Sequence, residues 1–284
     1  MDKRMLFTLK KQAVVIRKHI IDQVYHAKSG HIGGSLSSTD IMTFLYFNEM
    51  KVNAGNPLDP DRDRFVLSKG HCTPALYAIL AEKGFFPREE LKKFRRIDSF
   101  LQGHPSMKDV PGVDMSTGSL GQGISASVGM AIVGKADGKS YRVYCIIGDG
   151  ELQEGQVWEA FMAGAHYKLD NLTVFLDHNG LQIDGKITDI MSPECVILKF
   201  KAFNWNVLVI DGHDLEQIEA AVQKAKQTKG KPTVIVAQTV KGKGVSFMEN
   251  KVGWHGVAPN EEERNMAIKE LDEYAVRLEE ENNG

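Results

Sequence analysis

The sequence predicts an α/β fold with a doubly wound, mainly parallel sheet and helices on both faces. Short apolar segments of strand-like composition alternate with longer segments in which apolar residues recur every three or four positions. Strands separated by helices need crossover connections, and right-handed crossovers bring such strands together as parallel neighbours in one sheet. We therefore expect about five parallel strands and a ligand site beyond their carboxyl ends.

The N-terminal segment opens with an amphipathic helix over residues 5–28. Its apolar side chains recur at helical spacing: Leu9, Ala13, Ile16, Ile20 and Val24. The Gly/Ser-rich segment 29–35 predicts a loop. Ser38 or Thr39 is then expected to cap a short apolar helix that runs to Met50.

Turn signals separate the next elements. Residues 53–63 contain two prolines and predict a connection to a short strand at 64–67. Pro74 suits the first turn of a helix over 74–83. Residues 97–119 are rich in Gly, Pro and Ser and predict a long loop, a feature that compact domains usually keep for function.

The remaining segments continue the alternation. Further helices are expected at 121–138, 151–167, 194–203 and 214–228, and further strands at 141–147, 172–176, 205–210 and 233–238. A Gly-rich basic loop covers 240–259, and the acidic tail 260–284 has a helical stripe of Ile268, Leu271, Tyr274, Ala275 and Leu278. We expect one domain over 1–259, with 260–284 as a helical tail of the same domain.

Composition excludes several classes of protein. With 42% hydrophobic and 25% charged residues, the chain of 284 residues is neither disordered nor fibrous. A net charge of −2 does not indicate a nucleic-acid partner. The three cysteines share no CxxC spacing, which argues against disulfides and zinc. No apolar run approaches a membrane span and no secretory leader is visible, so we expect a cytoplasmic protein without a membrane partner.

Two polar positions follow neighbouring strands of the expected sheet. Asp149 comes directly after one strand, within Gly148-Asp149-Gly150, and Asn179 follows the next strand. If these strands are adjacent, a carboxylate, an amide oxygen and a nearby backbone carbonyl suit Mg²⁺ or Ca²⁺, with phosphate oxygens completing the shell. The glycines let backbone N–H groups approach that phosphate at a helix N-terminus. The alternative is a simple strand-to-helix turn followed by a tight Asn-Gly turn.

Five histidines lie in loops that contain glycine or proline. They are His31, His71, His104, His213 and His255. Imidazole donates, accepts or shuttles protons near neutral pH, so several in one pocket would suit a polyhydroxylated substrate. Any one of them alone is also explained by an ordinary structural hydrogen bond.

These motifs occur together in one characteristic order. Ser-Gly-His at 29–31 is followed by Leu-Ser-Lys-Gly-His at 67–71, Gly-His-Pro at 103–105, residues 116–123, residues 148–155, Asn179 and residues 241–255. Over nearly its whole length the chain resembles the N-terminal, diphosphate-binding part of a transketolase. The resemblance implies the thiamine-diphosphate-binding fold and transfer of a two-carbon ketol unit from a ketose phosphate to an aldose phosphate.

The resemblance also implies roles for individual residues. The predicted metal ligands for Mg²⁺, or for Ca²⁺ or Mn²⁺, are Asp149, Asn179 and the carbonyl of Leu181. The predicted contacts to thiamine diphosphate are His71, Gly118, Ser119, Leu120, Gly150, Glu151, Asn179, Lys241 and His255. The predicted catalytic residues facing the sugar are His31, His104 and His255. His31 and His255 would stabilise or protonate the carbonyl oxygen, and His104 would hold a hydroxyl. Ser119 stands where many family members have proline.

A complete transketolase has more than twice this length. The chain therefore resembles the N-terminal subunit of a split, two-chain enzyme whose second subunit carries the pyrimidine-binding and C-terminal domains, although truncation of a longer protein is an alternative. The small-residue face of the helix from Gly121 and the loop at Glu154 suggest self-association into an A₂B₂ heterotetramer. We expect a role in the pentose phosphate pathway and no activity without the partner.

Other functions are also compatible with parts of the sequence. A subunit of a deoxyxylulose-phosphate-synthase-like or 2-oxo-acid decarboxylating enzyme would use the same cofactor. A nicotinamide dehydrogenase is suggested only by the Gly-rich stretch 118–123, which does not lie between a clear strand and a helix with an acidic residue about 20 positions further on. A scaffold subunit without catalytic activity is the last alternative, and the intact motifs argue against it.

Overall fold

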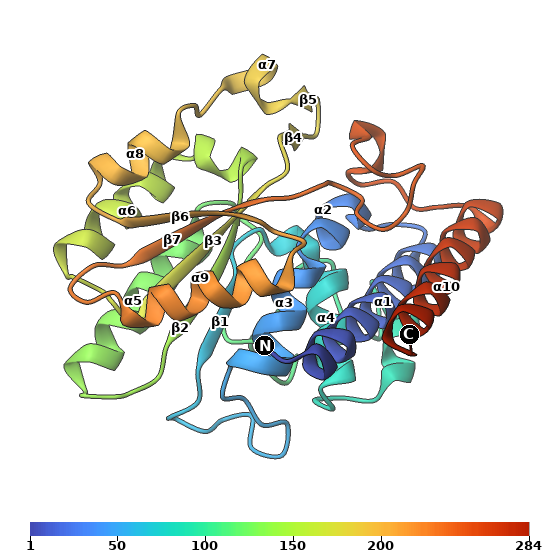
Figure 1. The fold of residues 1–284 in the computed structure, drawn as a ribbon, viewed down its shortest axis with the longest axis horizontal. Coiled ribbons are helices and arrows are strands. Elements are labelled where there is room, and N and C mark those ends of the chain that lie inside the picture. Colours follow the sequence, from blue (N-terminus) through green and yellow to red (C-terminus); the bar gives the residue numbers. More distant parts are fainter. Residues whose placement is uncertain (284) are drawn as a thin grey trace.

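The computed structural model describes residues 1–283 and contains a parallel sheet enclosed by helices (Figure 1). Its five strands lie in the order β1-β2-β3-β7-β6, and every neighbouring pair is parallel. Their bounds are β1 Arg64–Leu67, β2 Val143–Gly148, β3 Leu172–His178, β6 Asn206–Asp211 and β7 Thr233–Gln238. The predicted doubly wound α/β fold is confirmed.

Helices cover both faces of this sheet. The α-helices of the described chain are α1 Lys3–Ala27, α2 Ile32–Ser37, α3 Thr39–Phe44, α4 Thr73–Glu82, α5 Gln122–Ala136, α6 Gly155–His166, α7 Ile187–Met191, α8 Val196–Ala202, α9 Leu215–Gln227 and α10 Glu261–Asn283. Alternate strand residues feed two apolar cores, because successive side chains of a strand point to opposite faces. Tyr144 and Ile146 pack with α1, α3, α4 and α9, whereas Cys145 and Ile147 pack with α5, α6 and α8.

Three local predictions are wrong in detail. Residues 32–35 of the expected loop 29–35 are helical and belong to α2, and the hydroxyls of Ser38 and Thr39 bond back to the carbonyls of Gly34 and Ser35 instead of capping a helix. Such back-bonding competes with capping wherever the preceding residues are already helical. The expected helix 151–167 is interrupted at Glu154, between a 3₁₀ turn over Gly150–Gln153 and α6.

A small hairpin with no sequence prediction projects beyond the sheet. It consists of β4 Leu181–Gln182 and β5 Gly185–Lys186, which pair antiparallel, and it leads into α7 at the top of the view in Figure 1. Gln153 ties it to the body, because its amide donates to Gln182 Oε1 at 2.8 Å and to the carbonyl of Met191 at 2.9 Å.

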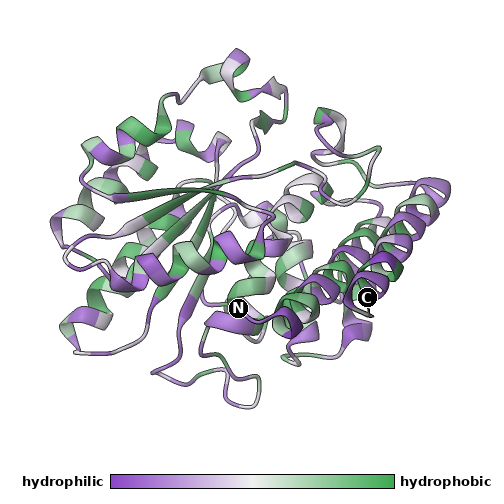
Figure 2. Cartoon of the chain, in the orientation of Figure 1, coloured by the Kyte–Doolittle hydropathy of each residue, from purple (hydrophilic) through white to green (hydrophobic). Residues whose placement is uncertain are grey.

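The acidic tail forms α10, which lies along α1 (Figure 1). Its buried side chains are Ala267, Leu271 and Leu278, whereas Tyr274 of the predicted stripe is exposed. Figure 2 shows the apolar strands at the centre of the molecule and the largely hydrophilic surface of α10. Within residues 1–283 none of the helices is both long enough and apolar enough to span a membrane.

Candidate active site

Two neighbouring strands bring the predicted metal-binding loops together. β2 and β3 pair with Gly148 opposite Asp177, so the chain leaves both strands at the same edge of the sheet. Beyond that edge the backbone N–H of Gly180 donates to the carboxylate of Asp149 at 2.6 Å. The loops that carry Asp149 and Asn179 therefore meet, and they meet at the carboxyl ends of the strands.

Oxygen atoms at this edge suit a divalent cation. Asp149, Asn179 and Leu181 line one small polar cavity, and Asp149 is 2% exposed. Nowhere in residues 1–283 do three His, Cys, Asp or Glu side chains form a metal-binding cluster, so the candidate ligands are one carboxylate, one amide oxygen and one backbone carbonyl. Such hard oxygens fit Mg²⁺ or Ca²⁺. Burial, followed by the charge of Asp177, raises the pKa of Asp149 to about 6.

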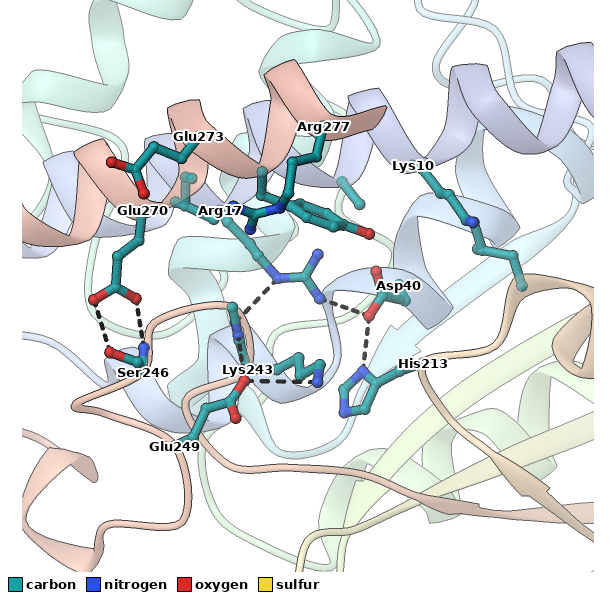
Figure 3. A pocket seen from close by; sticks show the side chains of 15 residues that line it. Lys10, Arg17, Asp40, His213, Lys243, Ser246, Glu249, Glu270, Glu273 and Arg277 are labelled. Atoms are coloured by element: carbon teal, nitrogen blue, oxygen red, sulfur yellow. Dashed lines mark hydrogen bonds and ion pairs between the residues drawn. The ribbon is translucent and has the colours of Figure 1, made fainter. Parts of the chain in front are cut away.

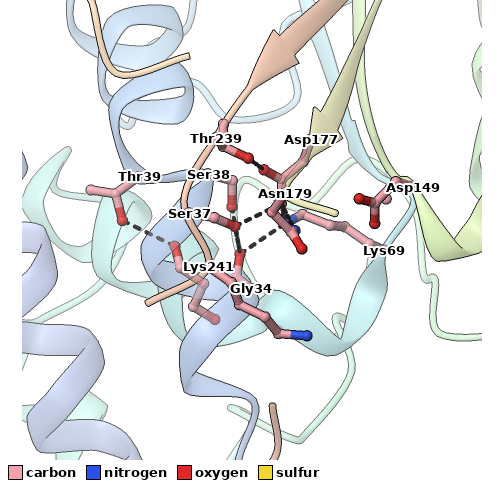
Figure 4. Close-up of polar contacts among 12 residues, drawn as sticks. Gly34, Ser37, Ser38, Thr39, Lys69, Asp149, Asp177, Asn179, Thr239 and Lys241 are labelled. Carbon is pink, nitrogen blue, oxygen red and sulfur yellow. Dashed lines mark hydrogen bonds and ion pairs between the residues drawn. The ribbon is translucent and has the colours of Figure 1, made fainter. Parts of the chain in front are cut away.

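Asp177 is a fully buried carboxylate that the sequence analysis missed (Figure 4). It accepts from Lys69 Nζ at 2.5 Å, from Ser37 Oγ at 2.7 Å and from Thr239 Oγ1 at 2.5 Å. Burial alone would raise the pKa of Asp177, but the charge of Lys69 and the hydrogen bonds from Lys69, Thr239 and Ser37 together hold the pKa below its usual range. An acidic residue within an otherwise apolar strand is the sequence signal that could have indicated this ion pair.

The ion pair also orients the candidate ligand Asn179. Asn179 Nδ2 donates to Asp177 at 3.2 Å, and Asn179 Oδ1 accepts from the backbone N–H of Leu181 at 3.1 Å. These two bonds determine which end of the amide is oxygen. Lys69 meanwhile donates to the carbonyl of Gly34 at 2.7 Å, which links the α2 segment to the same cluster.

Glu151 is buried and lines the same cavity. Its carboxylate accepts from Ser68 Oγ at 2.5 Å, from Gly121 N at 2.8 Å and from Gly148 N at 3.1 Å. Burial raises the pKa of Glu151. Both carboxylate oxygens are engaged by protein groups, so this residue connects three segments of the site, and its cofactor contact stays a prediction.

Three of the predicted histidines form a cluster. The ring of His31 lies 5.0 Å from that of His71 and 5.2 Å from that of His255, and the rings of His71 and His255 are 5.6 Å apart. His104 is exposed and lies against Gly118, where an added Cβ would come within 2.7 Å of its ring. His213 is not part of this cluster, because it bonds to Asp40.

The clustered imidazoles are neutral near pH 7. Burial is the main cause that lowers the pKa of His31 and of His71 to about 4 and that of His255 to about 3. Lys241, only 2% exposed, places its Nζ 2.7 Å from Nδ1 of His255. An ammonium only donates, so Nδ1 accepts and the proton of His255 lies on Nε2. Lys241 also donates to the Leu181 carbonyl at 3.3 Å.

The remaining predicted cofactor contacts are Gly118, Ser119, Leu120 and Gly150, and only the last two line the cavity. Gly118 has a φ of +145°, and the close approach of His104 requires a residue without Cβ there. Leu120 and Gly150 line the polar cavity with Asp149, whereas Ser119 is exposed. The stretch 118–121 follows a long irregular segment instead of a strand, which removes the structural context for a nicotinamide fingerprint.

The chemistry of the cavity fits a metal-bound diphosphate. The hard oxygens of Asp149, Asn179 and Leu181 line the same cavity as Lys241, His71 and His255. His31 Nδ1 is buried and has no hydrogen-bond partner among residues 1–283, so the cluster has polar capacity left for a ligand. Fold and site together define an α/β protein with a candidate site for a metal–diphosphate group beyond the carboxyl ends of a parallel sheet.

Comparisons with known proteins give the family. Residues 9–274 match the family described as "Transketolase, thiamine diphosphate binding domain", and the chain belongs to this family. It is 44% identical over 277 residues to one subunit of the apulose-4-phosphate transketolase of Phocaeicola vulgatus, covering 98% of each chain. It is 47% identical over 264 residues to "6-deoxy-6-sulfo-D-fructose transketolase subunit SqwG" of a Clostridium species, covering 93% of this chain and 96% of that one.

Longer transketolases match over part of their length. The crystal structure of a Pichia stipitis transketolase in complex with sedoheptulose 7-phosphate has a TM-score of 0.87 and 30% identity, with 96% of this chain and 45% of that chain covered. The Campylobacter jejuni transketolase gives 0.84 and 32%, with 99% and 48% covered. The chain therefore spans about half the length of these solved transketolases. The predicted resemblance to the N-terminal subunit of a two-chain transketolase is confirmed.

Proposed function

We propose that this chain is the diphosphate-binding subunit of a two-chain transketolase that moves a two-carbon ketol unit between sugar phosphates. The observation that carries the proposal is the meeting of Asp149, Asn179 and Leu181 with Lys241 and the neutral His255 at one sheet edge. The subunit names of the relatives that match over their whole length support it.

The cation ligands would hold the diphosphate end of the cofactor. Asp149, Asn179 Oδ1 and the Leu181 carbonyl would bind Mg²⁺, with Ca²⁺ or Mn²⁺ as substitutes, and His71 and the Gly150 N–H would face the phosphates. Bound thiamine diphosphate supplies the nucleophilic carbon that accepts the transferred unit.

The histidines would orient and polarise the sugar. With Lys241 fixing Nδ1 as an acceptor, His255 presents Nε2–H as a donor, which suits the carbonyl oxygen of a ketose. The lowered pKa of His255 favours a neutral donor over an imidazolium acid near pH 7. His31 would act beside it, and His104, at the exposed rim, would hold a hydroxyl.

A second subunit would complete the site. We propose that it carries the pyrimidine-binding and C-terminal domains, and that two copies of each chain form an A₂B₂ heterotetramer. Cytoplasmic location and a place in the pentose phosphate pathway belong to the same proposal. The purified chain alone should bind thiamine diphosphate weakly and transfer no ketol group, and light scattering of the reconstituted complex that gives a stable 1:1 heterodimer would contradict the tetramer.

The test is a coupled assay on this chain with and without the second subunit. Xylulose 5-phosphate, apulose 4-phosphate and 6-deoxy-6-sulfo-D-fructose serve as donors and ribose 5-phosphate as acceptor. Turnover with at least one sugar donor only when both chains are present supports the proposal. Decarboxylation of pyruvate without ketol transfer would instead support the related split enzymes that use the same cofactor, and robust turnover by this chain alone would refute the two-chain assignment.

A further inference from the structure

A buried polar network lies at the floor of a cavity between α1, α10 and the loop after β7 (Figure 3). Arg17, Asp40 and His213 form it. Arg17 and Asp40 are 5% and 7% exposed. None of the three lines the polar cavity around Asp149.

The donor and the acceptor of each hydrogen bond in this network can be assigned. Arg17 Nη2 and His213 Nδ1 lie 2.5 Å and 2.8 Å from the same carboxylate oxygen of Asp40. The backbone N–H of Val240 donates to His213 Nε2 at 2.8 Å, so His213 is protonated on Nδ1 and donates to Asp40. Burial would raise the pKa of Asp40, but Arg17, followed by His213, holds it at about 2, so the carboxylate is charged.

The same network forms two hydrogen bonds to the backbone of the loop after β7. Val240 N–H binds His213, and the carbonyl of Lys243 accepts from Arg17 Nε at 3.1 Å. The two residues between these points face the opposite way. Lys241 reaches His255, and Gly242 donates its backbone N–H to the carbonyl of Gly33 at 3.0 Å.

Close packing leaves this loop little freedom. Gly244 has a φ of +93°, and a Cβ there would lie 2.9 Å from Cδ of Arg17. On the other side, a Cβ on Gly33 would lie 3.0 Å from Cγ of Lys241. The backbone around Lys241 is therefore held between the network on one side and α2 on the other.

We propose that Arg17, Asp40 and His213 are positioning residues that hold the loop so that the Lys241 ammonium meets His255. The effect on cofactor binding rests on the proposed function, whereas the effect on the loop does not. Substitutions of His213 can separate the contribution of the hydrogen bond to the loop from that of the hydrogen bond to Asp40. Nε2 of His213 accepts from the loop, whereas Nδ1 donates to Asp40.

Two substitutions separate these contributions. The amide of His213→Gln reaches the position of Nε2 and restores an acceptor for the Val240 N–H. The amide of His213→Asn reaches the position of Nδ1 and restores only the donor to Asp40. His19→Gln is the matched control, because His19 on α1 also pairs with a carboxylate, Glu82 at 2.9 Å, away from this loop.

Hydrogen exchange of the full chain, followed by mass spectrometry of peptides over residues 239–251, measures the loop directly. His213→Asn should exchange on the order of tenfold faster there than wild type, while His213→Gln and His19→Gln stay close to wild type. Equal protection in all variants, or faster exchange in His213→Gln than in His213→Asn, would overturn the proposal.

Calorimetric titration with thiamine diphosphate and Mg²⁺ measures the consequence for the site. His213→Asn should bind about three- to thirtyfold more weakly than His213→Gln. Equal affinities in the two variants, despite different loop exchange, would overturn the link to Lys241. Absence of binding in the wild type would count against the proposed function, and the exchange experiment would still decide the positioning of the loop.

Discussion

Removal of the buried charge at Asp177 provides a sharp test of how the site is held together. In Asp177→Asn the side chain keeps its shape and one oxygen acceptor, but the Lys69 ammonium loses the carboxylate that lies 2.5 Å away. The exposed fractions of the two side chains are 3% and 0%, so water cannot replace the lost partner. The substitution therefore leaves an uncompensated buried cation.

The expected effect on stability is large. At this separation and an effective dielectric constant of about 20, the attraction between the two charges is on the order of 7 kcal/mol, and the desolvation of both ions offsets much of it. Removal of one partner of a buried pair typically lowers the free energy of unfolding by about 3–5 kcal/mol. Since domains have about 5–15 kcal/mol in total, the variant should lose a substantial part of its stability.

Urea denaturation of three variants measures this effect. Asp177→Asn and Lys69→Met should each be strongly destabilised, and the double variant should lose about 2–3 kcal/mol less than the sum of the two. Lys135→Met, in an exposed pair with Asp170, should lose less than about 1 kcal/mol. A double variant in which the two losses simply add would refute the reasoning.

Further predictions concern the candidate metal ligand Asp149, the histidine His31 and the buried carboxylate of Glu151. Asp149→Ala should weaken binding of thiamine diphosphate with Mg²⁺ by about 10- to 100-fold in calorimetry, and wild-type affinity would contradict its role. The pKa of His31 is lowered from 6.5 to about 4 in the folded chain, so as pH falls the imidazole of His31 is protonated in the unfolded chain before it is protonated in the folded chain. Stability from His31 is thus present above about pH 6.5 and lost toward pH 4, and His31→Asn should flatten the decline of Tm over that window; unchanged slopes would show the assignment to be wrong. Glu151→Gln should cost about 1–3 kcal/mol, because the carboxamide NH₂ cannot accept the bonds that the carboxylate accepts, whereas the exposed Glu159→Gln should be nearly neutral in the same melts.

Local patterns in the sequence were sufficient for the sheet and for the placement of the main site loops. The apolar stretch Leu172–Leu176 and the helical spacing in 5–28 each depend on residues close together in the chain. The Gly-Asp-Gly turn after β2 and the Asn-Gly turn after β3 meet because parallel neighbours end at the same sheet edge.

Reliance on local sequence patterns also explains the wrong predictions. Ser38 and Thr39 are of residue types that commonly cap helices, but their hydroxyls can equally well donate to carbonyls of a preceding helical turn. Tyr274 fits the periodic stripe of the tail, yet it is exposed, whereas Ala267, which was not part of the predicted stripe, is buried. In both cases the choice depended on what packs nearby.

The sequence by itself determined the family, the alternation of strands and helices, and which loops reach the carboxyl edge of the sheet. Only the tertiary structure decided the ionisation and the partners of the polar residues. Lys69 and Asp177 are 108 positions apart, and Asp40 and His213 are 173 positions apart. The pKa of His255 is lowered because distant segments exclude water from it. Burial and long-range pairing arise from the folding of the whole chain, so no local spacing of residues could reveal them.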